Sequence, residues 1–323
     1  MTLALRPPML PVARRVRAYF APVARATESP AIFDPALHGA FALDAPPAPW
    51  LDLGWIENLR RLPGTRILPV RGGAKGAAAA QVRAQLDARV EFEFREWGKL
   101  QMALAGGSQH MNALAVQGTP APQPAGGAPA AAVPLQPGST ATELVLGAAV
   151  SSFAAGDLVA VDRDYQGETG YVGSGLAAAY VKGPADVQND ANYIRRVTFN
   201  VGRIASLTAT SVLLAQPLLG GAPPAAAKIQ KVIAVLDREG GSFFQEWSAL
   251  FVLPEESGGR VCFFYPRLQP AAPAQEQPFE LADPLAGVAL RAAFVALPYT
   301  DSSDSEQVVC YRSYFPAATA AIY

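Results

Sequence analysis

The chain has 323 residues, 16% of them charged, and a formal net charge of -1 at pH 7. This balance gives no bulk attraction to phosphate and so disfavours a protein that grips nucleic acid. The absence of a run of about 18 apolar residues excludes a predicted membrane-spanning helix. The 29 prolines and 28 glycines indicate many turns and predict a mainly β fold. The low charged fraction indicates either extensive subunit contact or a composition biased toward Ala, Gly and Pro.

The first segment, residues 1–29, is rich in arginine and has its first acidic residue at Glu28. Such a composition is typical of organellar transit peptides, but the prolines interrupt the amphipathic helix that these need. We therefore predict an extended basic N-terminal arm that lies on a neighbouring surface, with transit as the alternative.

A hairpin is predicted next, from TRILPV at 65–70 and QVRAQLDARVEFEF at 81–94. Between them, RGGAKGAAAA at 71–80 is predicted to be a long flexible loop, in which Arg71 and Lys75 serve a contact.

The end of this second segment alternates in character. Val90, Phe92 and Phe94 alternate with Glu91, Glu93 and Arg95, which predicts a strand with one buried and one charged face.

A short helix follows directly. Trp97, Leu100 and Leu104 have helical spacing, so we expect them to form the packing face of the helix. Gly106 and Gly107 are expected to end the helix.

Two Ala/Pro/Gly-rich tracts predict that one domain interrupts another. Three consecutive domains are the alternative, disfavoured because the last segment alone is short of a full core. The predicted organisation is an arm at 1–29, a discontinuous domain at 30–114 and 229–323, a linker at 115–138, an inserted small β domain at 139–216 and a linker at 217–228.

Readable chemistry is scarce. His38 and His110 stand alone, DRDYQGE at 162–168 begins like a calcium loop but loses the pattern, and no nucleophile motif is present. Cys262 and Cys310 could pair or remain small apolar residues. We expect no enzyme, no cofactor and no metal site.

The order of these elements resembles one protein family. The stretch at 50–108, with its Trp50, Asp52, Leu53, Gly54 and Trp55 opening, Gly-rich hairpin, alternating strand and short helix, resembles the tail tube proteins of long-tailed bacteriophages. FVLPEESGGRVCFFYPRLQPA and LRAAFVALPYTDSSDSEQVVCYRSYF look like the C-terminal strands of that family. Together these stretches cover about a third of the chain.

The resemblance implies a β-sandwich or barrel with one short flanking helix, carrying an inserted small β domain. It implies rings, usually of six copies, that assemble in the bacterial cytoplasm and stack into the virion tail tube. Its expected partners are further copies of the chain, the tape measure and tail terminator proteins, and DNA passing transiently through the lumen; membrane binding is not expected.

Within that implied tube, Glu91, Glu93 and Arg95 are the candidates for lining the lumen, where acids would repel the DNA backbone. The alternative is that the acids face solvent or pair with Arg95 and its neighbours. The candidates for inter-ring contact are Arg71, Gly72, Gly73, Lys75 and Gly76.

Two other functions remain open from the sequence. One is the tube of a phage-derived contractile injection or type VI secretion system, which a neighbouring sheath gene would indicate. The other is a β-rich adhesin or carbohydrate-binding module in which Trp50, Trp55, Trp97 and Trp247 supply stacking surfaces.

Overall fold

The computed structural model divides into two compact units. Unit 1 comprises Met1–Gly107 and Phe244–Tyr323, and unit 2 comprises Ser108–Phe243. The residues that the structure describes are 15–23, 27–64, 66–72, 77–85, 88–96, 98–115, 130–162, 169–171, 178–180, 200–238, 245–255, 258–271 and 290–317.

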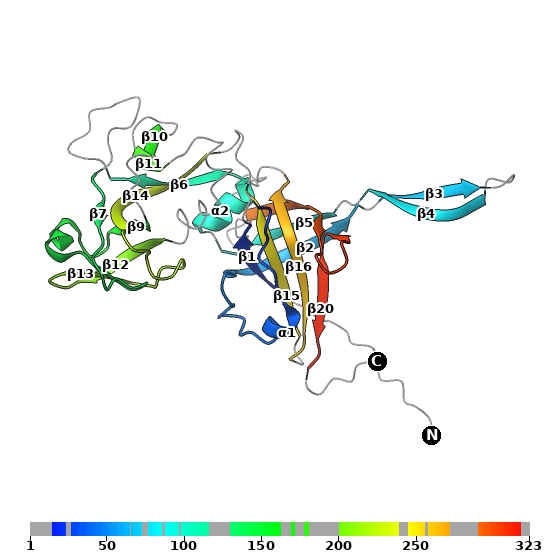
Figure 1. The fold of residues 1–323 in the computed structure, drawn as a ribbon, viewed down its shortest axis with the longest axis horizontal. Coiled ribbons are helices and arrows are strands. Elements are labelled where there is room, and N and C mark those ends of the chain that lie inside the picture. The colour runs from blue at the N-terminus through cyan, green and yellow to red at the C-terminus, as the bar shows by residue number, and fades with distance from the viewer. Residues whose placement is uncertain are drawn as a thin grey trace, which may run out of the picture. The chain divides into compact units, whose positions relative to one another are not determined.

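Six antiparallel strands of unit 1 close into a barrel (Figure 1). They follow the order β15, β1, β2, β5, β17, β16, and β16 then pairs with β15. The strand β20 pairs with the first half of β16, whereas β17 pairs with its last residues. The predicted mainly β fold with little helix is confirmed. The strand bounds are β1 Val16–Pro22, β2 Leu51–Pro63, β5 Ala88–Phe94, β15 Trp247–Pro254, β16 Arg260–Pro270, β17 Leu290–Ala296 and β20 Tyr311–Phe315.

Aromatic rings fill the inside of the barrel. Phe20 of β1 lies 5.5 Å from Phe294, 6.0 Å from Phe251 and 6.2 Å from Phe92, measured between ring centroids. Because these four residues come from strands on different sides of the barrel, the contacts place them in its interior. Phe92 also stacks on Phe294, and edge-to-face and offset pairs of this kind stabilise by roughly 0.5–1.5 kcal/mol beyond burial.

A second apolar layer covers the outside of β1, β15 and β16. Tyr19 and Phe264 point away from the barrel interior and pack with Phe33 and Trp50 of the segment between β1 and β2. This segment contains the four-residue helix α1, Pro35–His38, which begins after Asp34, whose carboxylate accepts from the Ala36 amide. The three covered strands therefore bury both faces, which explains their continuous apolar character.

The predicted helix is present as α2, Lys99–Gly106. Leu100 is 8% exposed and Leu104 is fully buried, as predicted, and α2 packs on β17 and β16. The helix ends at Gly106 and its C-cap is Gly107, whose φ of 58° is the left-handed conformation that glycine adopts without strain. Trp97, the third predicted packing residue, lies outside the described residues.

The β2–β5 hairpin continues beyond the barrel as a two-stranded ribbon, β3 Arg66–Gly72 and β4 Ala77–Gln85. Pro63 is the partner of Ala88 in the barrel and Arg66 is the partner of Gln85 in the ribbon, so the two separate sheets keep the same register. In Figure 1 the ribbon runs out from the barrel beyond β2 and β5.

The predicted loop at 71–80 is wrong over most of its length. Arg71 pairs with Ala78 and Gly72 with Ala77, because the growing β3–β4 ladder satisfies backbone groups that small side chains leave accessible. Gly73, Lys75 and Gly76 lie outside the described residues.

The predicted N-terminal arm is also wrong in part, since Val16–Pro22 is a barrel strand. β1 pairs with β2 on one side and with β15 on the other, and Ala18, Tyr19, Phe20 and Ala21 are completely buried.

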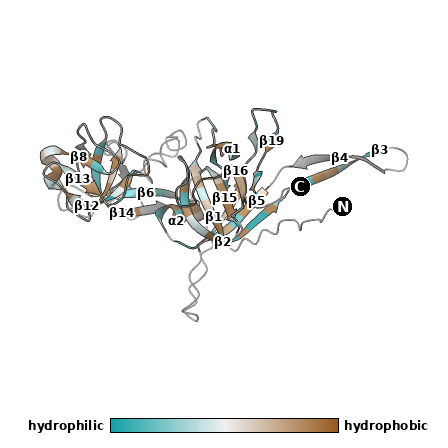
Figure 2. Ribbon diagram, turned by 90° about the horizontal axis from the view of Figure 1, so that it is seen from below, coloured by the Kyte–Doolittle hydropathy of each residue, from teal (hydrophilic) through white to brown (hydrophobic). Residues whose placement is uncertain are grey.

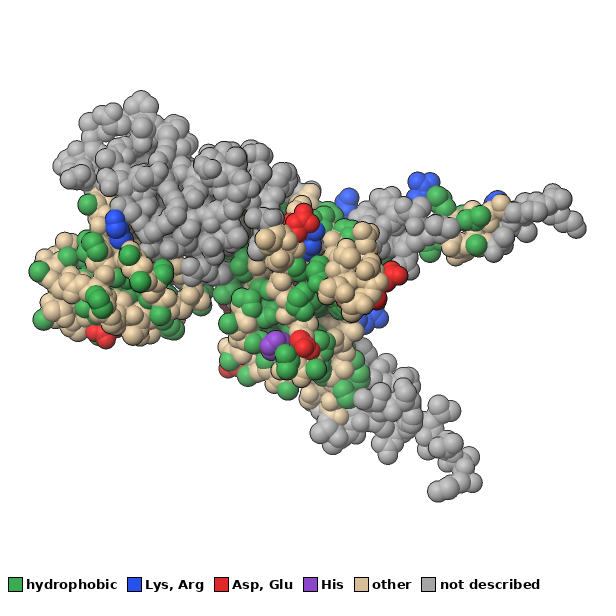
Figure 3. Space-filling model, viewed as in Figure 1, with side chains coloured by type: hydrophobic (Ala, Val, Ile, Leu, Met, Phe, Trp, Pro, Cys, Tyr) green, Lys and Arg blue, Asp and Glu red, His purple; other side chains and the backbone are tan. Residues whose placement is uncertain are grey.

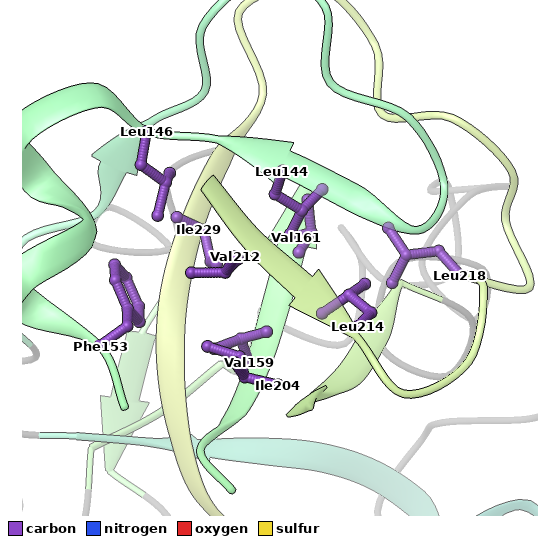
Figure 4. Close-up of a cluster of buried hydrophobic side chains, with 10 residues drawn as sticks. All are labelled: Leu144, Leu146, Phe153, Val159, Val161, Ile204, Val212, Leu214, Leu218 and Ile229. Atoms are coloured by element: carbon purple, nitrogen blue, oxygen red, sulfur yellow. The ribbon is translucent and has the colours of Figure 1, made fainter. Parts of the chain in front are cut away.

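Unit 2 is a second β structure with its own core (Figure 4). Val159, Ile204, Val212 and Ile229 meet there from four different strands. The described strands form the order β10, β11, β6, β14, β9, β12, β13, β8, with β7 also on β14. Their bounds, with the 3-10 helix η1, are β6 Gln109–Leu114, β7 Val133–Pro134, β8 Glu143–Val145, η1 Gly147–Ser152, β9 Leu158–Asp162, β10 Thr169–Tyr171, β11 Ala178–Tyr180, β12 Val201–Leu207, β13 Ser211–Leu214 and β14 Lys228–Arg238.

The bounds of unit 2 differ from the predicted 139–216. β6 and β14 pair along their length, for example His110 with Asp237, so strands assigned to the outer domain belong to the inserted one. The predicted linker at 217–228 buries Leu218 in the core of unit 2, and β7 lies within the other predicted linker. The rest of that linker, at 116–129, is outside the described residues.

Candidate assembly surfaces

The predicted alternation in β5 is confirmed. Val90, Phe92 and Phe94 are at most 2% exposed and face the barrel interior, while Glu91 and Glu93 lie on the outer face. The charged face follows from closing the barrel, since every second side chain must then point outward.

This outer face carries both signs of charge. The Glu93 carboxylate accepts from Asn58 Nδ2 at 2.8 Å and from Arg291 at 3.3 Å. Arg95 pairs with Glu57 of β2. Two of the acids on this face are therefore paired with arginines, as in the alternative left open by the sequence, while Glu91 forms no ion pair with a described residue.

The Trp-Leu-Asp-Leu-Gly-Trp opening at 50–55 is held by local contacts of the barrel. Trp50 is 4% exposed in the second apolar layer, and Asp52 accepts from Arg17 and from the amide of Gly54. The Arg17 guanidinium lies 5.3 Å from the Trp55 ring, and its hydrogen bond with Asp52 raises the pKa of Arg17. These contacts join the start of β2 to β1.

Gly54 has a left-handed backbone in this opening. Its φ is +83°, and an added Cβ would lie 3.3 Å from the Glu96 carboxylate. We expect Gly54→Ala to lower the free energy of unfolding by roughly 1–2 kcal/mol, because a side chain disfavours left-handed backbone. Urea denaturation measures the change. Gly258→Ala, with φ of +92° and open space around it, separates backbone strain from crowding, and an unchanged midpoint for Gly54→Ala would contradict the strain argument.

Arg61 of β2 lies in a polar and aromatic cluster with side chains of β16 and with Cys310. Its Nε donates to the Tyr265 hydroxyl at 2.7 Å, a second nitrogen approaches Cys310 Sγ at 3.4 Å, and the guanidinium lies 4.0 Å from the Phe263 ring centroid. Burial raises the pKa of Tyr265 to about 12 and also raises that of Cys310. The tyrosine is therefore a neutral hydrogen-bond partner at pH 7.

The two cysteines are free thiols, so the structure has no bond between them. Burial raises the pKa of Cys262 to about 12, which keeps this thiol protonated and of low reactivity.

The ribbon exposes large apolar side chains on both of its faces. Leu62 at the end of β2 and Ile67, Leu68 and Val70 of β3 are between 43% and 54% exposed. Ile67 and Leu68 are neighbours in sequence and so point to opposite faces. Figure 2 colours this part of β3 as hydrophobic, and Figure 3 shows green apolar and blue basic side chains along the ribbon.

A two-stranded ribbon with both faces open is marginally stable in water. Scattered exposed apolar residues need no explanation, but this group is concentrated in nine residues of one projecting element. The ribbon is therefore a candidate surface for contact with another molecule.

An acidic hairpin lies near the C-terminus of unit 1, with strands β18 Tyr299–Thr300 and β19 Gln307–Val308. The Asp301 carboxylate accepts from Ser303 Oγ at 2.6 Å and from the Tyr311 hydroxyl at 2.5 Å. The Ser303 and Tyr311 hydrogen bonds lower the pKa of Asp301 to about 2. They tie the turn to β20, while Asp304 and Glu306 are exposed.

The two histidines belong to different units. His38 ends α1 in unit 1, and His110 is buried in β6 of unit 2. Within the described ranges, no group of three or more His, Cys, Asp or Glu side chains could hold a metal ion. Most of the calcium-like stretch, at 163–168, falls outside the described residues. Among the helices that the structure describes, none is long and apolar enough to cross a membrane.

The tryptophans differ in exposure. Trp247 is completely buried and Trp50 nearly so, Trp55 is half-buried beside Arg17, and Trp97 lies outside the described residues.

The sequence analysis did not identify the basic ribbon or the acidic hairpin as surfaces of opposite charge. The signal was present as an acid-free stretch at 66–85 and an acid-rich one at 301–306.

Comparison with known proteins adds no relative. A scan against protein-family models found no match, and a search of curated proteins found none either.

Proposed function

We propose that this chain is a structural subunit of a phage tail tube, whose copies form rings that stack around a lumen for the genome. The observation that carries the proposal is the projecting β3–β4 ribbon, which continues a hairpin of a closed barrel and exposes apolar side chains on both faces.

The ribbon supports self-assembly because its apolar side chains are exposed to water in the single chain. Burying apolar area stabilises by about 25 cal/mol per Å², so covering Ile67, Leu68 and Val70 favours association. If each chain carries one ribbon and one surface that receives it, copies bind head to tail, and such contacts generate either closed rings or extended filaments. A tube of stacked rings needs contacts within a ring and contacts between rings.

The barrel supplies the second requirement, a polar wall. The outer face around Glu91, Glu93 and Arg95 is our candidate for the lumen. Because Glu93 and Arg95 each have an ion partner, the Arg95 guanidinium is not free to hold phosphate, which supports a wall along which the DNA backbone can slide.

The closely related alternative is the tube of a contractile injection or secretion system, which would use the same surfaces. The carbohydrate-binding alternative loses two of its four proposed stacking rings, because Trp50 and Trp247 are in the core.

Negative-stain electron microscopy over a concentration series tests the proposal. The intact protein should form rings or tubes. A variant in which residues 64–87 are replaced by Asn-Gly should remain as single rings or monomers, since Pro63 and Ala88 are cross-strand partners that a two-residue turn can join.

The control is the fold of the shortened barrel. Its tryptophan fluorescence spectrum should match that of the intact protein, because the ribbon contains no tryptophan. Intact protein that stays monomeric at every concentration, or tubes formed equally well without the ribbon, would contradict the proposal.

A further inference from the structure

The ribbon is basic as well as apolar. Between Arg66 and Gln85 the sequence contains Arg66, Arg71, Lys75 and Arg83 and no acidic residue. Arg66 is exposed and forms no ion pair with any described residue, so its charge is available to a partner. The surface that covers the ribbon should therefore combine apolar contact with negative charge.

The β18–β19 hairpin is the complementary surface on the same chain. Between Tyr299 and Val308 the sequence contains Asp301, Asp304 and Glu306 and no Lys or Arg. Asp304 and Glu306 are exposed and form no ion pair with the described residues. Asp301 instead holds the turn to Tyr311, which fixes the position of the other two acids.

Within one chain these two elements belong to separate two-stranded sheets. The chain therefore carries a basic ribbon and an acidic hairpin, and the strands of one do not pair with those of the other. Charge complementarity together with the uncovered apolar face points to a second copy of the chain as the occupant.

We propose that the ribbon of one copy docks against the β18–β19 hairpin of a neighbouring copy. This inference rests on the proposed self-assembly and names the surface that receives the ribbon. The apolar side chains of β3 supply the buried area, whereas the exposed ion pairs select partner and register, because such pairs add little affinity but penalise wrong charges.

Charge reversal on each surface tests the docking. The ribbon variant carries Arg66→Glu and Arg71→Glu, and the hairpin variant carries Asp304→Arg and Glu306→Arg. Each variant should lower the association constant by about tenfold or more, because like charges then face each other. Sedimentation velocity at low salt measures this constant. The variant with all four changes should regain assembly.

Matched controls reverse exposed charges of unit 1 outside both elements, Arg15→Glu and Asp44→Arg, and should assemble like the unchanged protein. Near-ultraviolet circular dichroism checks that every variant is folded. The unchanged protein should also lose assembly as salt increases, since exposed charges are screened.

The outcomes separate the two proposals. Assembly lost in both single-surface variants and regained in the combined one supports the docking. Rings or tubes in all variants, or no recovery in the combined variant, overturn the docking and leave the tube proposal standing. Monomers of the unchanged protein at every concentration overturn both.

Discussion

Phe20→Ala is expected to lower the free energy of unfolding of unit 1 by about 3–5 kcal/mol. Phe20 is completely buried and contacts rings from β5, β15 and β17, so its removal leaves a cavity that no single strand can close. The loss combines the transfer of the ring to water with the contacts forfeited by its neighbours.

Urea denaturation followed by tryptophan fluorescence measures this loss in unit 1 alone. All four tryptophans, Trp50, Trp55, Trp97 and Trp247, belong to unit 1. Ile32→Ala is the control, since Ile32 is 50% exposed and its change should stay within about 0.5 kcal/mol. Equal midpoints for the two variants would refute the aromatic core as the main stabilising element of the barrel.

Leu144→Ala in unit 2 should cost about 2–5 kcal/mol in the free energy of unfolding of that unit. Leu144 is completely buried and packs in a cluster that shares no residue with the core of unit 1. We therefore expect amide hydrogen exchange to accelerate in unit 2, while the urea midpoint of tryptophan fluorescence stays unchanged.

The control for unit 2 is Leu219→Ala, at a position 67% exposed. It should leave hydrogen exchange in unit 2 close to that of the unchanged protein. A tryptophan midpoint that moves with Leu144→Ala as far as the exchange rates do would show that the units unfold together, contrary to the expectation from their separate cores.

The features that were predicted correctly depend only on residues close together in the sequence. The period of two in Val90, Phe92 and Phe94 requires only neighbouring residues, and so does the end of α2 at Gly106 and Gly107. Both depend on backbone geometry and on side chains within one strand or one turn.

The features that were missed depend on distant partners. β1 was predicted to be part of an arm because residues 1–29 are rich in arginine and contain several prolines. Its own stretch, Val16–Pro22, has no polar and apolar alternation that would indicate a strand, and this follows from burial on both faces. One of its faces is covered by the barrel interior and the other by Phe33 and Trp50, and its partner β15 is more than 200 residues away.

The ribbon strand β4 also depends on a partner that its own sequence does not indicate. Its run of four alanines at 77–80 has little intrinsic preference for strand, and pairing with β3 makes it one. Likewise, the boundary of unit 2 depends on β6 pairing with β14, which no local pattern reports.

The sequence by itself determined the mainly β class, the interrupted order of segments and the two-faced strand β5, because composition, turn residues and period act locally. The tertiary structure alone decided that the strands close into a barrel, that Glu93 and Arg95 have ion partners, and that an apolar basic ribbon stands uncovered. These depend on which strands meet across long sequence separations, and a single sequence does not encode that choice in any one stretch.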